Sequence, residues 1–226
     1  GKTTMAKLVA KALNCEEGIG HQCNHCSNCL AINNGSHPDV IEIDAASNNG
    51  VDDVRDIIER VKYSPMKGRY KVYIIDEVHM MSASAFNALL KTLEEPPAHV
   101  IFILATTELQ KIPLTILSRC QRFSFKKLTP DIIVSNILRI SKLENIEITD
   151  SAANLIAELA DGAMRDALSM LDQLSKENVL IDDKLIGDTF GFVGSKDVEN
   201  IFELLNDACY DDVNAIFKEY GDKGLN

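Results

Sequence analysis

The feature that most constrains the fold is a repeated alternation of short apolar runs with amphipathic segments. Three runs have the length of strands and are rich in Val and Ile: Val40–Ile43, Lys71–Ile75 and Val100–Ala105. Apolar residues at helical spacing fill Val51–Val61, and a second helix, capped by Ser82, is expected to stop at Pro96. Gln121–Phe125 is expected to form a fourth strand. Buried strands that alternate with helices predict an α/β fold, with a parallel sheet covered on both faces.

The pattern changes after Lys127, where helical periodicity continues without another strand. Further helices are expected at Pro130–Leu143, Asp150–Ala160, Met164–Leu174, Ser195–Asn206 and Asp211–Tyr220. Gly194 interrupts the helical pattern. We therefore expect an α/β domain over residues 1–127, an all-α domain over residues 128–193, and the start of another helical domain over residues 194–226.

Composition limits the class of partner. The 226 residues include 23 Lys and Arg against 34 Asp and Glu, which gives a formal net charge of −11. This acidic balance argues against a protein that binds nucleic acid through a net positive charge, because binding to the phosphate backbone needs clustered Lys and Arg. No apolar run approaches the roughly 18 residues of a membrane span, and no signal peptide is visible. We expect a cytoplasmic protein without membrane contact.

The tetrapeptide Gly1-Lys2-Thr3-Thr4 precedes the first expected helix and matches the end of the phosphate-binding loop G-x-x-x-x-G-K-[ST]. In such a loop, backbone N–H groups face phosphate oxygens, Lys2 would neutralise phosphate charge, and the Thr3 hydroxyl would bind Mg²⁺. An ordinary helix start is the alternative interpretation. Only half of the loop is present, so we expect this piece alone to bind ATP weakly.

A second motif follows the central apolar run, where Asp76 and Glu77 end the strand. Asp76 would hold Mg²⁺ through its water shell, and Glu77 would orient and deprotonate the water that attacks ATP. Alone, the pair could be a solvated acidic turn; with the upstream phosphate loop it predicts ATP hydrolysis. Thr107, after the third run, could lie near the γ-phosphate or could satisfy a turn. His79 is assigned a structural role.

Two arginines are candidates for contact with nucleotide. Arg119, in Ser118-Arg119-Cys120, follows a short helix and could reach the γ-phosphate bound by a neighbouring subunit. Arg165 begins a helix of the second domain and could contact the nucleotide of its own chain. The alternatives are a surface arginine at residue 119 and a surface ion pair between Arg165 and Asp166.

Four of the six cysteines are clustered, in the pattern Cys15-x7-Cys23-x2-Cys26-x2-Cys29. Four thiolates at this spacing can close a tetrahedral Zn²⁺ site, and a closed site leaves no position open for catalysis. The clustering favours a metal in a reducing compartment over a disulfide scaffold. His21 and His25 are possible substitute ligands, whereas Cys120 and Cys209 are expected to be ordinary thiols.

The chain resembles the gamma/tau subunits of the bacterial DNA polymerase III clamp loader, a family of AAA+ ATPases. Besides the cysteine cluster, the resemblance rests on GKTT, VIEIDAASNNGVDDVRDI, VYIIDEVHMMS, FNALLKTLEEPP, FILATTELQKIP, ILSRCQRF and GAMRDALSMLDQ. It runs from Gly1 to about Gln173. The roles it implies are a phosphate loop at Gly1, Lys2, Thr3 and Thr4, a Walker B pair at Asp76 and Glu77, a first sensor at Thr107, a trans-acting finger at Arg119, a second sensor at Arg165, and zinc ligands at Cys15, Cys23, Cys26 and Cys29.

The resemblance also implies a function and partners. The chain would be an ATP-hydrolysing motor subunit, with ATP, Mg²⁺ and Zn²⁺, in a hetero-oligomeric ring that loads the sliding clamp onto primed DNA. It would belong to the polymerase holoenzyme without polymerising DNA itself. Compared with the family, the first strand, the front of the phosphate loop and part of the helical collar are missing, so we expect a fragment of a longer chain. The competing interpretations are a non-catalytic, zinc-stabilised adaptor, another AAA+ DNA motor, and a zinc module that binds nucleic acid.

Overall fold

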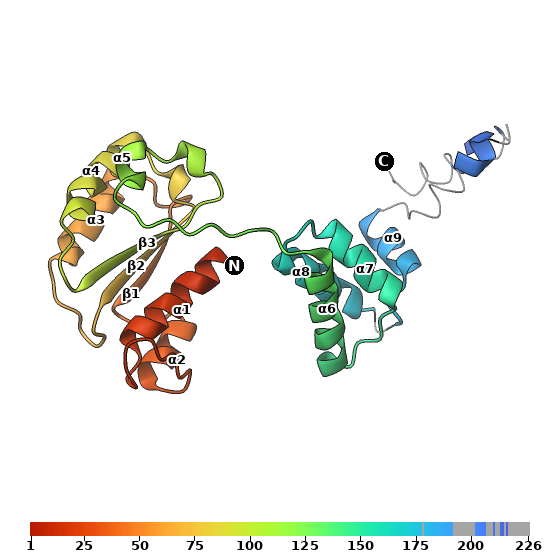
Figure 1. Cartoon of the computed structure of the whole chain (residues 1–226), viewed down its shortest axis with the longest axis horizontal. Coiled ribbons are helices and arrows are strands. Elements are labelled where there is room, and N and C mark those ends of the chain that lie inside the picture. The colour runs from red at the N-terminus through yellow and green to blue at the C-terminus, as the bar shows by residue number, and fades with distance from the viewer. Residues whose placement is uncertain (178, 192–201, 207–209, 211–212, 215, 217–226) are drawn as a thin grey trace. The chain divides into compact units, whose positions relative to one another are not determined.

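The computed structural model describes residues 1–191 except 178, together with residues 202–206, 210, 213, 214 and 216. The chain divides into two compact units, Gly1–Phe125 and Lys126–Asn226 (Figure 1). The division into three domains that the sequence suggests stays a prediction, because residues 194–226 lie largely outside the described part of the chain.

The first unit is built on a parallel sheet of three strands in the order β1-β2-β3 (Figure 1). These are β1 (Val40–Asp44), β2 (Lys71–Asp76) and β3 (Val100–Leu104), so the three predicted strands are confirmed. The register sets Asp44 beside Asp76 and Ile75 beside Leu104. The carboxyl ends of the strands therefore lie at one edge of the sheet, which is where parallel α/β folds bind ligands.

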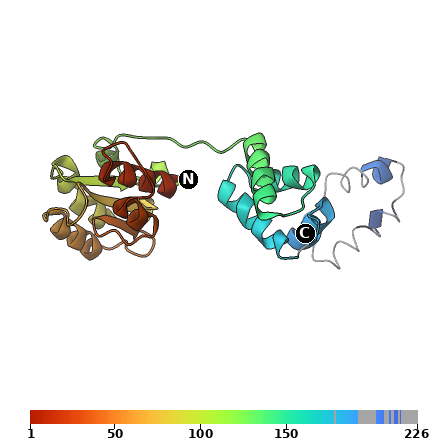
Figure 2. The same ribbon diagram turned by 90° about the horizontal axis from the view of Figure 1, so that it is seen from below.

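Helices cover both faces of this sheet, as the two views show (Figures 1 and 2). On one face, α1 (Lys2–Asn14) and α2 (Ser27–Asn33) pack against Val72 and Ile74. On the other, α3 (Val51–Val61) and α4 (Ala83–Glu94) pack against Tyr73 and Ile75. Alternate residues of β2 thus enter opposite cores, which explains why the strand is apolar from Val72 to Ile75.

Short elements connect the strands to the helices. The 3₁₀ turn η1 (Val78–Met80) follows β2, and the 3₁₀ turn η2 (Leu109–Lys111) and the short helix α5 (Leu114–Leu117) follow β3. The predicted cap of α4 is confirmed, because the Ser82 hydroxyl accepts a hydrogen bond from the backbone N–H of Ala85 at 3.2 Å. Helix α2 was not expected within the cysteine segment.

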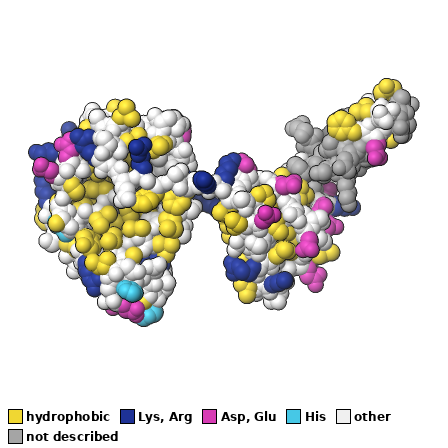
Figure 3. Space-filling view, viewed as in Figure 1, with side chains coloured by type: hydrophobic (Ala, Val, Ile, Leu, Met, Phe, Trp, Pro, Cys, Tyr) yellow, Lys and Arg dark blue, Asp and Glu magenta, His cyan; other side chains and the backbone are white. Residues whose placement is uncertain are grey.

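The predicted fourth strand at Gln121–Phe125 is wrong. The segment has no regular secondary structure, and among the described residues β3 pairs only with β2. An alternating segment forms a strand only when it pairs with a neighbouring strand that its side chains can pack against. This segment has no such neighbour among the described residues, and Phe123 and Phe125 are 72% and 54% exposed. Apolar side chains also gather on the visible face of this unit (Figure 3).

The second unit, as far as it is described, is helical. Its helices are α6 (Pro130–Glu144), α7 (Asp150–Leu159), α8 (Met164–Ser175) and α9 (Asp183–Phe190), arranged around one apolar core. Helix α9 was not expected. Of the helices predicted at Ser195–Asn206 and Asp211–Tyr220, most residues lie outside the described part of the chain. No helix among the described residues combines the length and the apolar character that crossing a membrane requires.

Candidate nucleotide and metal sites

The N-terminus of α1 offers a site for an anion. Gly1 is the N-cap, no side chain caps the helix, and no acidic residue lies in its first turn. The N–H groups of a helical first turn have no partner within the helix, and the helix dipole adds partial positive charge there. Lys2 and Thr3 are partly buried in this turn, and Thr4 is exposed. This end of the helix has the chemistry that phosphate groups require.

Thr3 connects that helix start to the acidic end of β2. Its hydroxyl donates a hydrogen bond to Oδ2 of Asp76 at 2.6 Å, across 73 positions in the sequence. The phosphate-loop motif and the acidic motif therefore meet at one place, as the interpretation of this chain as an ATPase requires. A hydroxyl and a carboxylate side by side are oxygen ligands of the kind that Mg²⁺ takes.

The chain turns sharply directly after Asp76. Glu77 has φ +46° and ψ +42°, a left-handed backbone conformation that residues other than glycine rarely adopt. Its N–H donates to Oδ1 of Asp76 at 3.0 Å, and the N–H of Val78 donates to the carbonyl of Ala105 at 2.9 Å. The turn thus holds Glu77 at the carboxyl edge of the sheet, next to the end of β3.

Thr107 contacts Glu77 directly. Its hydroxyl and its N–H donate to Oε2 of Glu77, at 3.0 Å and 3.3 Å. His79 contacts the same oxygen, because its Nδ1 lies 3.3 Å from it. The structure therefore brings Thr3, Asp76, Glu77 and Thr107 to one edge. Sequence reasoning missed the contact of His79, for which the only signal was its position two residues after Glu77.

The two candidate arginines belong to different units, Arg119 to the first and Arg165 to the second. Arg119, just beyond α5, forms an ion pair with Glu94 on α4, and it also donates to the carbonyl of Thr115 and the hydroxyl of Ser118. These polar contacts do not include Asp76, Glu77 or Thr107. Arg165 is exposed in the first turn of α8, in the second unit. The roles expected for both arginines stay predictions.

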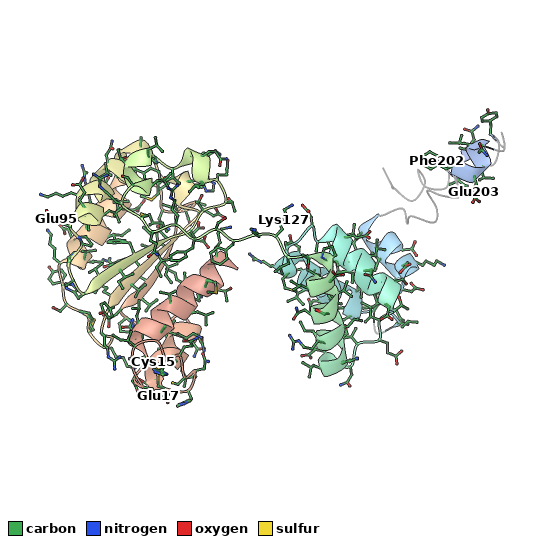
Figure 4. The ribbon with its side chains drawn as sticks, viewed as in Figure 1. Cys15, Glu17, Glu95, Lys127, Phe202 and Glu203 are labelled. Atoms are coloured by element: carbon green, nitrogen blue, oxygen red, sulfur yellow. The ribbon has the colours of Figure 1, made fainter. Side chains whose placement is uncertain are left out.

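The four clustered cysteines come together at the far end of α1. Their sulfur atoms all lie within 4.8 Å of one another, with 4.0 Å from Cys15 to Cys26 and 4.0 Å from Cys23 to Cys29. Tetrahedral zinc with Zn–S bonds of about 2.3 Å requires sulfur atoms about 3.8 Å apart. The four thiols therefore fit a zinc ion. Figure 4 shows Cys15 at this end of the unit, close to Glu17.

Local structure explains how the cysteines converge. Cys15 is the C-cap of α1, and Cys26 is the N-cap of α2, where its sulfur accepts from the N–H of Cys29 at 3.4 Å. Burial opposes ionisation of the Cys26 thiol, but backbone hydrogen bonds with Glu16 and Cys29 and the neighbouring thiols lower its pKa to about 6. Burial raises the pKa of the Cys23 and Cys29 thiols, so Cys26 forms the thiolate, the form that binds metal, more readily than these two neighbours.

The remaining candidates are peripheral to this cluster. His25 pairs with Glu17 at 3.0 Å, and the two form a small group with Cys23 that shares this thiol with the four-cysteine cluster. Cys120 packs against the core between the sheet and α4, and burial raises the pKa of its thiol. Cys209 lies outside the described residues.

Comparisons with known proteins show the family and the fold. A family model described as DNA polymerase III, delta subunit, matches residues 1–129, and one described as DNA polymerase III clamp loader subunit, ATPase lid domain, matches residues 132–174. Solved structures of RuvB, the Holliday junction branch migration motor of Thermotoga maritima, share the fold. One of them has a TM-score of 0.55 at 18% identity and covers 81% of this chain and 65% of that one.

Curated relatives are more similar in sequence. DNA polymerase III subunit tau of Bacillus subtilis is 52% identical over 221 residues, which cover 92% of this chain and 39% of the relative. Subunit tau of Escherichia coli is 44% identical over 227 residues, which cover 100% of this chain and 35% of the relative. This chain thus spans well under half of the length of these two relatives. The expected AAA+ fold and the expected resemblance are confirmed, and the chain belongs to the DNA polymerase III clamp-loader family that includes the gamma and tau subunits.

Proposed function

We propose that this chain is the nucleotide-binding part of an ATP-hydrolysing clamp-loader subunit. The whole protein would act with partner subunits in a ring that loads a sliding clamp onto primed DNA. The observation that carries the proposal is the 2.6 Å hydrogen bond from Thr3 to Asp76, beside the contact of Thr107 with Glu77. An adaptor without catalysis would have no chemical need for these groups at one edge.

Different residues of this edge would bind the phosphates, bind Mg²⁺ and accept the proton of the attacking water. The N–H groups of the first turn of α1 and the ammonium group of Lys2 would bind the phosphates of ATP. Thr3 and Asp76 would hold Mg²⁺, which supplies positive charge against the phosphate oxygens. Glu77 would then accept the proton of the attacking water, because a carboxylate at this edge serves as a general base.

The two arginines would link hydrolysis to assembly. Arg119 would leave Glu94 and contact the γ-phosphate bound by a neighbouring subunit, so that turnover requires a correctly formed ring. Arg165, at the start of α8, would contact the nucleotide of its own chain and report its state to the helical unit.

Zinc would have a structural role. Bound by Cys15, Cys23, Cys26 and Cys29, it would tie the end of α1 to the start of α2 and fix the loop between them. Four thiolate ligands leave no coordination position for a substrate. The ion would thus stabilise the fold of this segment and take no part in hydrolysis.

The test uses the full-length subunit assembled with its partner subunits. Glu77→Gln should keep ATP affinity within about twofold and should lower the turnover number at least about 100-fold, which is the usual contribution of a general base. Glu59→Gln, an exposed change on α3, is the matched control and should turn over normally. Unchanged turnover in Glu77→Gln would remove Glu77 from the role of base. A wild-type complex that neither binds nor hydrolyses ATP would instead support the adaptor.

A further inference from the structure

His79 is placed between two carboxylates at the edge of the sheet. It lies in η1, and only 7% of its side chain is exposed. Its Nδ1 is 3.3 Å from Oε2 of Glu77 and 3.1 Å from the hydroxyl oxygen of Thr106, and its Nε2 is 3.3 Å from Oε1 of Glu108. A ring with polar neighbours at both nitrogens does more than fill space, because each contact restricts its rotation.

The contacts of Glu77 are confined to one of its two oxygens. Oε2 accepts hydrogen bonds from the hydroxyl and the N–H of Thr107, and it faces Nδ1 of His79. In the part of the chain that the structure describes, no hydrogen bond reaches Oε1. Contacts from two directions on one oxygen fix the plane of the carboxylate, and they leave the second oxygen available to accept a hydrogen bond from water.

The opposite side of the ring is anchored by the loop that follows β3. Lys111 donates to Oε1 of Glu108 at 2.8 Å, and this hydrogen bond is the main cause that lowers the pKa of Glu108, with smaller help from His79. The N–H of Glu108 donates to the hydroxyl of Thr106 at 3.0 Å. The loop at residues 106–108 therefore supplies polar partners to both ring nitrogens, Thr106 to Nδ1 and Glu108 to Nε2.

We propose that His79 is a positioning residue for Glu77. The imidazole holds Oε2 so that Oε1 is presented to the attacking water, and it couples this orientation to the loop at residues 106–108. A proton on Nδ1 makes the ring a donor to Glu77, and a proton on Nε2 makes it a donor to Glu108. The inference rests on the proposed function, because the orientation of Glu77 matters only where ATP is hydrolysed.

Two polar substitutions separate the two sides of the ring. The amide nitrogen of Asn can take the place of Nδ1, and that of Gln can take the place of Nε2. In the assembled complex, His79→Ala and His79→Gln should lower the turnover number for ATP about 10- to 100-fold, the usual effect of losing a group that orients a reactive residue. His79→Asn should stay within about threefold of wild type, and the dissociation constant for ATP should change less than about twofold in all three variants.

His99 provides the matched control. It is a half-buried histidine of the first unit, and its Nε2 faces the carbonyls of Val61 and Tyr63 at 3.2 Å and 3.1 Å. His99→Asn and His99→Gln should leave turnover unchanged. If the melting temperature shows that His79→Ala does not fold, the comparison of His79→Asn with His79→Gln still tests the positioning role.

Each outcome separates the inference from the function on which it rests. Wild-type turnover in His79→Gln, equal losses in His79→Asn and His79→Gln, or a loss of ATP affinity alone would overturn the positioning role. If any of these occurs while Glu77→Gln is inactive, the proposed function survives. Wild-type turnover in Glu77→Gln would overturn both.

Discussion

Replacing Asp39 by Asn tests how the segment before β2 is held in place. Asp39 precedes β1 and is fully buried. Its Oδ1 accepts a hydrogen bond from the N–H of Met66, and its Oδ2 accepts from the N–H groups of Lys67 and Gly68, all at 2.7 Å. One carboxylate therefore closes the turn that leads into β2, the strand that ends in Asp76.

The structure sets the size of the expected effect. Asn has about the volume of Asp, so no cavity forms. Its amide nitrogen is a donor, however, and it must face a backbone N–H that donates a hydrogen bond to the carboxylate in the wild type. Hydrogen bonds to charged groups contribute about 1.5–3 kcal/mol each, and the two that remain lose the charge. We expect the free energy of unfolding to fall by about 3 kcal/mol, which changes the ratio of folded to unfolded protein roughly 100-fold.

The effect should depend on pH in a defined direction. Burial alone would raise the pKa of Asp39, but the hydrogen bonds from the N–H groups of Gly68, Met66 and Lys67 outweigh it and lower the pKa. Because the folded pKa lies below the unfolded value of about 3.9, the charge stabilises the fold fully above that value. The stabilisation is lost as the pH falls through the folded pKa. The difference between the two proteins should therefore be constant above about pH 5 and shrink below about pH 4.

Urea unfolding followed by tyrosine fluorescence measures this difference. Three of the five tyrosines belong to the first unit, namely Tyr63, Tyr70 and Tyr73. Asp52→Asn is the control, because Asp52 is exposed and pairs with Arg55 at the surface, so its loss should cost less than about 1 kcal/mol. A destabilisation by Asp39→Asn below about 1 kcal/mol at pH 7, or one that persists undiminished at about pH 3, would refute the reasoning.

Two more predictions concern zinc and assembly. Metal analysis should find about one zinc per chain, lost in Cys26→Ser and retained in Cys120→Ser; a zinc-free wild-type chain would contradict the proposed site. Arg119→Ala should lower the ATP turnover of the assembled complex at least about tenfold without changing ATP affinity, whereas Arg122→Ala, an exposed neighbour, should not. Glu94→Gln, which releases Arg119 from its ion pair, should keep wild-type turnover. If Arg119→Ala also turned over ATP at the wild-type rate, a role of Arg119 in trans would be excluded.

Much of the fold could be predicted because its signals are local. A strand covered on both faces has a continuous apolar run, as β2 has from Val72 to Ile75, and an amphipathic helix such as α3 repeats its apolar residues every turn. The cysteine cluster was also predictable, since only two residues separate Cys23 from Cys26 and Cys26 from Cys29 in sequence. None of these features requires knowledge of a distant partner.

The failures have different causes. The alternation at Gln121–Phe125 shows which side chains could share a face, but it does not show whether another strand lies beside them. Helix α2 begins at an unusual cap, the thiol of Cys26, which does not appear among common capping residues. Helix α9 had a signal that could have been used, because Asp182 caps it and accepts from the N–H of Leu185 at 2.8 Å.

The candidate site shows why motifs alone were insufficient. They identified Asp76, Glu77 and Thr107, and parallel pairing of β2 with β3 places the segments that follow these strands side by side. What the motifs did not reveal is the left-handed turn at Glu77, which directs the following residues toward β3. A non-glycine residue in this conformation costs of order 1–3 kcal/mol, and glycine would avoid the cost. Glycine, however, has no carboxylate, so the base proposed here requires a residue that tolerates this strain, and the same turn places Oε2 of Glu77 3.3 Å from Nδ1 of His79.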